Sequence, residues 1–200
     1  MVHNQKGEQS KKLLSQLTRL DNYLEQILYY VRSENAEKDY LITKVNLSKV
    51  ISNIALKNKD ILLAKGIDFI VSDVDIEVLT DSKWLEFIIN QIVDNSIKYS
   101  KEQNAYIKIV AKDENKVIRL IIYDNGKGIS KSDLPRVFDK TFTGTNGRGE
   151  SAKSTGMGLY LCRELCNKLG HKIQIISEEG KYTKITILFD KNTFFHIDKE

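Results

Sequence analysis

The segment Ile121-Ile122-Tyr123-Asp124-Asn125-Gly126-Lys127-Gly128-Ile129 joins an apolar run to an acidic, glycine-rich turn. The apolar run predicts a strand that delivers Asp124 to the edge of a sheet. The glycines that follow let the chain turn sharply and let a planar ligand approach the main chain. A carboxylate at this place can accept a hydrogen bond from an exocyclic amine, the group that distinguishes adenine from guanine. A plain Asn-Gly turn after an acidic residue is the alternative interpretation.

A second glycine pair lies downstream, in Ser154-Thr155-Gly156-Met157-Gly158-Leu159. These glycines precede a predicted helix over 158–169, whose first N–H groups have no partner inside the helix. Together with the positive end of the helix dipole, such N–H groups favour a phosphate. The alternative is a glycine-rich linker before an ordinary helix.

A third motif lies on a helix that the apolar pattern predicts over 82–99. Asn95 and Lys98 are three residues apart and share a helix face with Gln91. An amide oxygen suits Mg²⁺ that is shared with phosphate oxygens, and Lys98 can act as a point charge on the same phosphates. A polar stripe on a half-buried helix is the alternative.

Taken together, these motifs resemble the ATP-binding catalytic domain of bacterial sensor histidine kinases, within the wider Bergerat-fold ATPase superfamily. Residues 94–99 are similar to the N box, 124–128 to the G1 box, 134–142 to the F box and 154–158 to the G2 box. The motifs follow the family's order, over residues 46–190. The resemblance implies an α+β fold, a two-layer α/β sandwich of the Bergerat type.

The same resemblance implies a role for each motif residue. Asp124 would bind the adenine amino group, and Asn95 would coordinate Mg²⁺, with Gln91 as a further metal contact. Lys98, Arg136 and Lys140 would neutralise phosphate charge, and Asn95 and Lys98 would be the catalytic pair. The remaining nucleotide contacts would be Tyr99, Gly126, Gly128, Ile129, Thr155, Gly156, Met157, Gly158 and Leu159. Residues 139–155 would form the ATP lid.

Gln91 bears on whether the phosphoryl group is transferred to water or to a protein acceptor. By the resemblance, hydrolytic members of the superfamily place a glutamate base one turn before the N-box asparagine, and an amide cannot accept a proton from water at neutral pH. Gln91 therefore favours phosphoryl transfer to a protein acceptor, for which positioning and charge neutralisation suffice. The alternatives are a protein-serine kinase or ATPase of the same superfamily, and a non-catalytic nucleotide-binding or dimerisation module.

The rest of the chain predicts helices on one face of a mixed, mainly antiparallel sheet, because hairpins dominate and helices do not alternate strictly with strands. The helices are expected over 47–64, 82–99 and 158–169, the first capped by Asn46 and ended by Gly66. The strands are expected over 67–72, 76–80, 105–111, 117–123, 172–177 and 183–189.

Residues 1–40 differ from the catalytic domain that we expect over 41–200. They carry apolar residues at alternating spacings of four and three, an a/d heptad seam that needs a partner helix. The seam consists of Leu13, Leu17, Leu20, Leu24, Ile27 and Val31. It predicts one long bundle helix, which by the resemblance is the second helix of a truncated dimerisation and histidine-phosphotransfer hairpin. A surface helix on the domain's own core is the alternative.

The resemblance also implies partners. A homodimer would form through the bundle helix, and a response regulator would receive the phosphoryl group. Residues 28–32 are similar to intramembrane-sensing kinases that work beside transporters, so we expect the cytoplasmic domain of a membrane-embedded protein. The phosphoacceptor histidine would precede an acidic residue, but His3 precedes Asn4. We therefore expect the acceptor to lie outside this chain, which would be unable to phosphorylate itself.

Composition sets wider limits. The 200 residues are 41% hydrophobic and 29% charged, which excludes a disordered or collagen-like chain. The formal net charge is +4 with both signs interspersed, so we expect no nucleic-acid partner. No apolar run reaches the roughly 20 residues that cross a bilayer. Cys162 and Cys166 share a helix face with leucines, which predicts core positions.

Overall fold

The computed structural model describes residues 40–144 and 155–191, together with Leu24. The chain divides into two compact units, Met1–Asp39 and Tyr40–Glu200. In the first unit only Leu24 is described, and it is helical and exposed. The predicted bundle helix and the rest of its apolar seam therefore lie outside the described residues.

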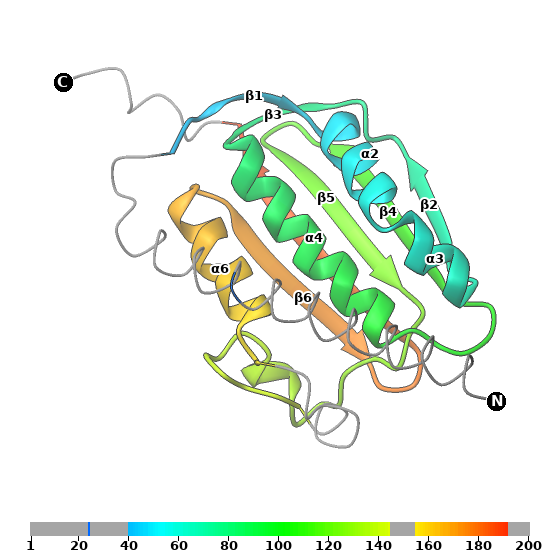
Figure 1. Ribbon diagram of the computed structural model, residues 1–200. Helices are drawn as coiled ribbons and strands as arrows, with labels where there is room; N and C mark the ends of the chain where they lie inside the picture. The colour runs from blue at the N-terminus through cyan, green and yellow to red at the C-terminus, as the bar shows by residue number, and fades with distance from the viewer. Residues whose placement is uncertain (1–23, 25–39, 145–154, 192–200) are drawn as a thin grey trace. The chain divides into compact units, whose positions relative to one another are not determined.

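A five-stranded sheet forms one layer of the second unit (Figure 1). Its strands are β2 (Asp68–Ser72), β4 (Tyr106–Asp113), β5 (Val117–Asp124), β7 (Tyr182–Asp190) and β6 (Lys172–Glu178), in that spatial order. β2 pairs with β4 in parallel, and the other pairs are antiparallel. The sheet is thus mixed and mainly antiparallel, as the sequence predicts.

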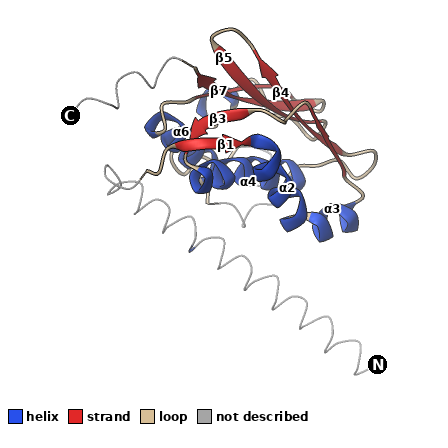
Figure 2. Ribbon diagram, turned by 90° about the horizontal axis from the view of Figure 1, so that it is seen from above, coloured by secondary structure: helices blue, strands red, loops and turns tan. Residues whose placement is uncertain are grey.

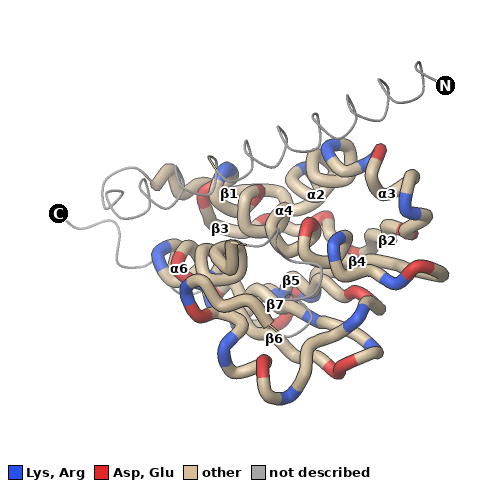
Figure 3. The backbone as a smooth tube through the Cα atoms, turned by 60° about the horizontal axis from the view of Figure 1, so that its bottom comes forward, with Lys and Arg blue, Asp and Glu red and all other residues tan. Residues whose placement is uncertain are grey.

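Helices form the other layer, on one face of this sheet (Figure 2). They are α2 (Leu47–Lys57), α3 (Lys59–Lys65), α4 (Ser82–Lys98) and α6 (Gly158–Lys168), with a short 3₁₀ helix at Leu134–Arg136. Ile118, Leu120 and Ile122 alternate along β5 with half-exposed residues and are buried in the core. Within the described part of the chain, no helix is long and apolar enough to span a membrane. Charges of both signs are interspersed along the backbone (Figure 3).

The helix predicted over 47–64 is wrong in one respect, because the chain breaks it into α2 and α3 at Asn58. The Asn58 side chain donates hydrogen bonds to the Ile54 carbonyl oxygen at 3.0 Å and to Asn90 Oδ1 at 3.1 Å. An asparagine that bonds to nearby backbone competes with the regular helix. The predicted ends are confirmed: Asn46 Oδ1 accepts from the Ser48 N–H at 2.9 Å, and Gly66 is left-handed at φ +61°.

A two-stranded sheet lies apart from the main one. Strand β1 (Thr43–Asn46) pairs antiparallel with β3 (Glu77–Thr80). The sequence predicts β3 but not β1, because Val45 is the only buried residue in that four-residue strand. So short a strand is formed by its partner rather than by its own propensity.

Asp81 holds the beginning of α4. Its Oδ1 accepts hydrogen bonds from the backbone N–H groups of Lys83 and Trp84, at 2.9 and 3.1 Å, as an N-cap does. Its Oδ2 accepts from the backbone N–H of Leu41 at 2.9 Å. The ring of Tyr40 lies 5.7 Å from that of Trp84, centroid to centroid. One carboxylate therefore fixes both the helix start and the chain that enters the domain.

Three titratable side chains on α6 and just after it are buried. Cys162 and Cys166 are free thiols in the core, and burial raises the pKa of Cys166 to about 12. His171 Nε2 lies 2.8 Å from Thr80 Oγ1, and the imidazole meets the Phe189 ring edge-on at 4.6 Å. Burial lowers the pKa of His171 to about 4.

The neutral His171 predicts that the protein loses stability in acid. Between its folded pKa of about 4 and an unfolded value of about 6.5, the unfolded chain binds more protons than the folded one. The contribution of His171 to the free energy of unfolding is thus complete above about pH 6.5, and it falls by up to about 3 kcal/mol as the pH approaches about 4. Urea unfolding across this range should show the slope, and His171→Gln should flatten it. Equal slopes for the two proteins would contradict the expectation.

Candidate functional site

The predicted site residues gather around the C-terminal half of α4. Asp124, at the end of β5, is only 7% exposed, and its two oxygens bind different parts of the chain. Ser96 Oγ, from α4, donates to Oδ2 at 2.9 Å. The backbone N–H of Gly126 donates to Oδ1, also at 2.9 Å. The N-box helix and the G1 turn therefore share this one carboxylate.

Burial raises the pKa of Asp124 above its ordinary value, because the charged form is desolvated. Hydrogen bonds from Gly126, Ser96 and the backbone of Thr183 act in the opposite direction. The two carboxylate oxygens offer about four acceptor positions, so the bonds from Ser96, Gly126 and Thr183 leave capacity for one more donor. Asp124 is thus held in place and can still accept a hydrogen bond from a ligand.

The G1 turn requires its glycines. A Cβ on Gly126 would lie 2.5 Å from the Tyr99 carbonyl oxygen, at the end of α4. A Cβ on Gly128, where φ is +64°, would lie 2.0 Å from the Glu178 carbonyl oxygen. Between them, Lys127 donates its backbone N–H to Tyr99 at 2.9 Å, and its carbonyl accepts from Gly180 at 2.7 Å. The turn is therefore held between α4 and the β6–β7 turn.

The start of α6 lies against the polar side of α4. A Cβ on Gly158 would be 2.9 Å from Gln91 Oε1 and 4.0 Å from Asn95 Nδ2. The two amide side chains predicted to hold a metal thus lie beside the helix start predicted to hold phosphate. Thr155 Oγ1 accepts from the backbone N–H of Met157 at 3.3 Å, which turns the chain into the helix. Leu159, in the first turn of α6, is half-buried.

The beginning of the predicted lid lies against Gly156, the residue that follows the lid's last position, 155. Thr141 is left-handed at φ +62°, which is strained for a β-branched residue. A Cβ on Gly156 would lie 2.5 Å from the Thr141 carbonyl carbon and 2.7 Å from the Phe142 carbonyl oxygen. Most of the lid, residues 145–154, lies outside the described residues.

The predicted phosphate-binding cations contact different parts of the chain. Lys98 Nζ lies 5.0 Å from the centroid of the adjoining Tyr99 ring. Lys140 Nζ lies 6.0 Å from the ring of Tyr160 on α6. The Arg136 guanidinium stays within its own segment, 4.5 Å over the Phe142 ring and near Asp139.

Ile129, a predicted nucleotide contact, is held through its backbone N–H, which donates to Ser177 Oγ of β6 at 2.8 Å.

The donor set indicates what kind of metal the site fits. Among the residues that the structure describes, no group of three or more His, Cys, Asp and Glu side chains could hold an ion. The amide oxygens of Gln91 and Asn95 remain. Hard amide oxygens without a protein cage fit Mg²⁺, which keeps several waters and shares phosphate oxygens.

Two contacts of the site were not predicted from the sequence. The sequence pattern places Ser96 only within the N box, yet it is an α4 side chain that donates to Asp124. Its signal was a hydroxyl between the buried Val93 and Ile97 on an otherwise apolar face. The Tyr99 carbonyl oxygen, for which the sequence predicts no role, accepts from the backbone N–H of Lys127 and so holds the G1 turn.

Comparisons with known proteins show the family of the chain. The family model described as "Histidine kinase-, DNA gyrase B-, and HSP90-like ATPase" matches residues 80–193. The sensor protein kinase GraS of Staphylococcus aureus (strain MRSA252) is 38% identical over 183 residues, which are 91% of this chain and 52% of GraS. The chain thus spans about half the length of the curated relatives it matches.

Solved structures share the fold. The Acinetobacter baumannii histidine kinase AdeS superposes with a TM-score of 0.72 at 22% identity, over 91% of this chain and 83% of AdeS. Histidine kinase ThkA, solved in complex with the response regulator protein TrrA, gives 0.67 at 22% identity, over 89% of this chain and 49% of ThkA. The predicted two-layer α+β fold is confirmed.

A pair of glycines tests the close approach at the G1 turn. Gly128 and Gly66 have nearly the same φ, but a Cβ on Gly66 meets nothing within 4 Å. Both alanine variants should show the left-handed strain of about 1 kcal/mol. Gly128→Ala should lose about 2 kcal/mol more, because its methyl group collides with backbone. Urea unfolding measures both, and equal losses would contradict the collision.

Proposed function

Because the chain belongs to the histidine kinase-, DNA gyrase B- and HSP90-like ATPase family, we propose that it is the catalytic part of a bacterial two-component sensor histidine kinase. It binds Mg-ATP and transfers the γ-phosphoryl group to a histidine on a dimerisation helix. One observation carries the proposal: Asp124 is joined to α4 at Ser96, while Gln91 and Asn95 of the same helix lie beside the start of α6.

At the adenine end, Asp124 accepts the exocyclic amine. The support is its burial together with the acceptor capacity that its bonds to Ser96, Gly126 and Thr183 leave. Gly126 and Gly128 bring the main chain close to the base, and Tyr99 and Ile129 complete this end.

At the phosphate end, Asn95 and Gln91 would hold Mg²⁺. The ion supplies positive charge that offsets the charge on the phosphates. Lys98, Arg136 and Lys140 add to this neutralisation. The first turn of α6 presents its unbonded N–H groups to the phosphates. The contacts on that side are Thr155, Gly156, Met157, Gly158 and Leu159.

Transfer to a protein acceptor is favoured over hydrolysis because of Gln91. Its amide lies beside Asn95 at the phosphate end and cannot remove a proton from water. Phosphoryl transfer needs the groups to be positioned and the charge to be offset, and this chain supplies both. A protein-serine kinase or ATPase of the same superfamily is the alternative.

The whole protein extends the proposal. GraS is named a sensor protein kinase, and ThkA was solved with a response regulator protein. By analogy, this chain is the cytoplasmic part of a membrane kinase that dimerises through residues 1–40 and works beside a transporter. It passes its phosphoryl group to a response regulator. The acceptor histidine lies outside the chain, which therefore does not phosphorylate itself.

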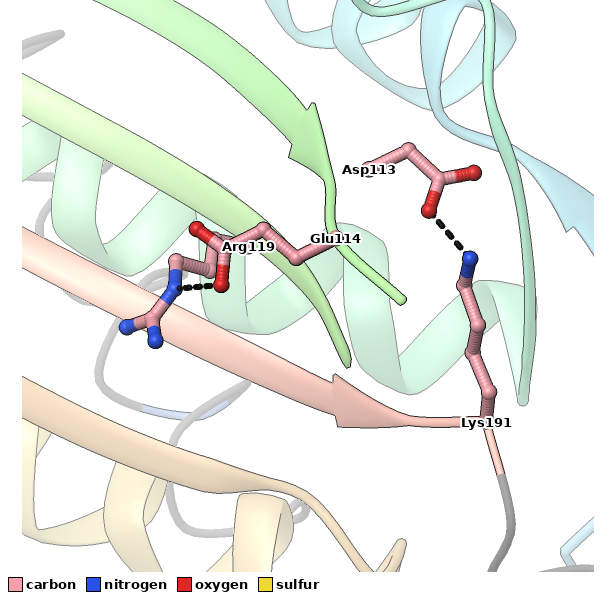
Figure 4. Close-up of polar contacts among 4 residues, drawn as sticks. All are labelled: Asp113, Glu114, Arg119 and Lys191. Atoms are coloured by element: carbon pink, nitrogen blue, oxygen red, sulfur yellow. Dashed lines mark hydrogen bonds and ion pairs between the residues drawn. The ribbon is translucent and has the colours of Figure 1, made fainter. Parts of the chain in front are cut away.

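The adenine contact predicts that Asp124→Asn weakens ATP binding by about 100-fold or more, because the variant loses a charged acceptor in a buried place. Calorimetry with Mg²⁺ and a non-hydrolysable ATP analogue measures the affinity. Asp113→Asn is the matched control, since Asp113 forms an exposed ion pair with Lys191 at the β4–β5 end (Figure 4). Equal affinity of the wild type and Asp124→Asn would contradict the proposal.

The reaction predicts transfer in trans. Incubated with labelled ATP and a separate dimerisation hairpin that carries an acceptor histidine, the chain should label the hairpin and remain unlabelled. The label should be lost in acid, as a phosphorylated imidazole is. Acid-stable label on this chain alone would instead support the serine kinase.

A further inference from the structure

Ser96 is a polar exception on the buried face of α4. It is 5% exposed and lies among apolar neighbours that include Ile92, Val93 and Ile97. A hydroxyl in such a place is unfavourable unless it forms a hydrogen bond. Its bond to Asp124 Oδ2, at 2.9 Å, satisfies it. An alanine would fill nearly the same space but could not donate this bond, so the hydroxyl's contribution is its contact with Asp124.

The bond fixes what Asp124 can do. Ser96 and Gly126 donate to opposite oxygens of one carboxylate, from α4 and from the turn after β5. Together with the backbone of Thr183, these donors set the rotation of the carboxylate plane. They also favour its ionised form, which only accepts hydrogen bonds, because each donor stabilises the charged carboxylate.

Resting on the proposed function, we propose that Ser96 is the positioning residue that sets the choice of purine, by holding Asp124 as a fixed acceptor. Adenine presents an amine at C6, which such an acceptor binds. Hypoxanthine and guanine present a carbonyl there, and two acceptors face each other with neither able to donate. Ser96 touches Asp124 and needs no contact with the base itself.

Loss of the hydroxyl relaxes this choice. The carboxyl group can then rotate about its bond to Cβ or take up a proton, and a protonated carboxyl donates to a C6 carbonyl. The direction agrees with the local electrostatics, because the Ser96 bond opposes the rise that burial causes in the pKa of Asp124. Without that bond, the pKa of Asp124 rises further and the protonated carboxyl group is more populated.

The test compares two nucleotides, the non-hydrolysable analogues of ATP and of inosine triphosphate, each with Mg²⁺. The measured quantity is the ratio of their dissociation constants in the whole chain. Ser96→Ala should reduce the preference for ATP by about tenfold, the worth of one hydrogen bond to a charged group. Ser96→Cys keeps the volume with a much weaker donor and should reduce it as well, even if the alanine variant does not fold.

Ser100→Ala is the matched control. Its hydroxyl also lies at the end of α4 but donates to the Ile97 carbonyl oxygen at 2.9 Å, so the ratio should stay at the wild-type value. A packing role for Ser96 would lower both affinities equally, so an unchanged ratio in the Ser96 variants overturns the proposal. A wild type that binds neither nucleotide overturns the proposed function, and this inference with it, before any variant is made.

Discussion

A buried carboxylate has to be compensated by donors, and in this protein the donors come from both layers of the fold. Asp124 ends a strand of the sheet, Ser96 belongs to the helix packed on that sheet, and Gly126 belongs to the turn that follows. The charge costs free energy in the core unless all of these groups meet. The layers are therefore held in one relative position at the place where the glycine turn begins.

Helix α4 serves the core and the site together. Leu85, Ile88 and Ile92 are almost completely buried, while Gln91 and Asn95 lie on the side that meets α6. The helical repeat places these two amides one turn apart on the same face. Packing of the apolar side thus determines where the amides lie, and the start of α6 cannot move without losing its fit against Gln91.

The sequence was sufficient for whatever depends on local pattern. The strands β4 and β5, the cap at Asn46 and the left-handed Gly66 follow from neighbouring residues. The break at Asn58 combines a local bond to the Ile54 carbonyl oxygen with a bond to Asn90, thirty-two residues away, and no local pattern contains the second bond. The same holds for Ser96 and Asp124, twenty-eight residues apart. The motifs named the site residues, their contacts required the fold, and their roles toward a nucleotide stay predictions.

The bond between Leu41 and Asp81 has a mechanical consequence. The carboxylate that caps α4 also accepts a hydrogen bond from the backbone N–H of Leu41, near the point where the chain enters the domain. A helix of 17 residues is a stiff rod of roughly 25 Å. A force on the backbone at Leu41 therefore acts directly on the first turn of α4, the helix whose other half carries Gln91 and Asn95.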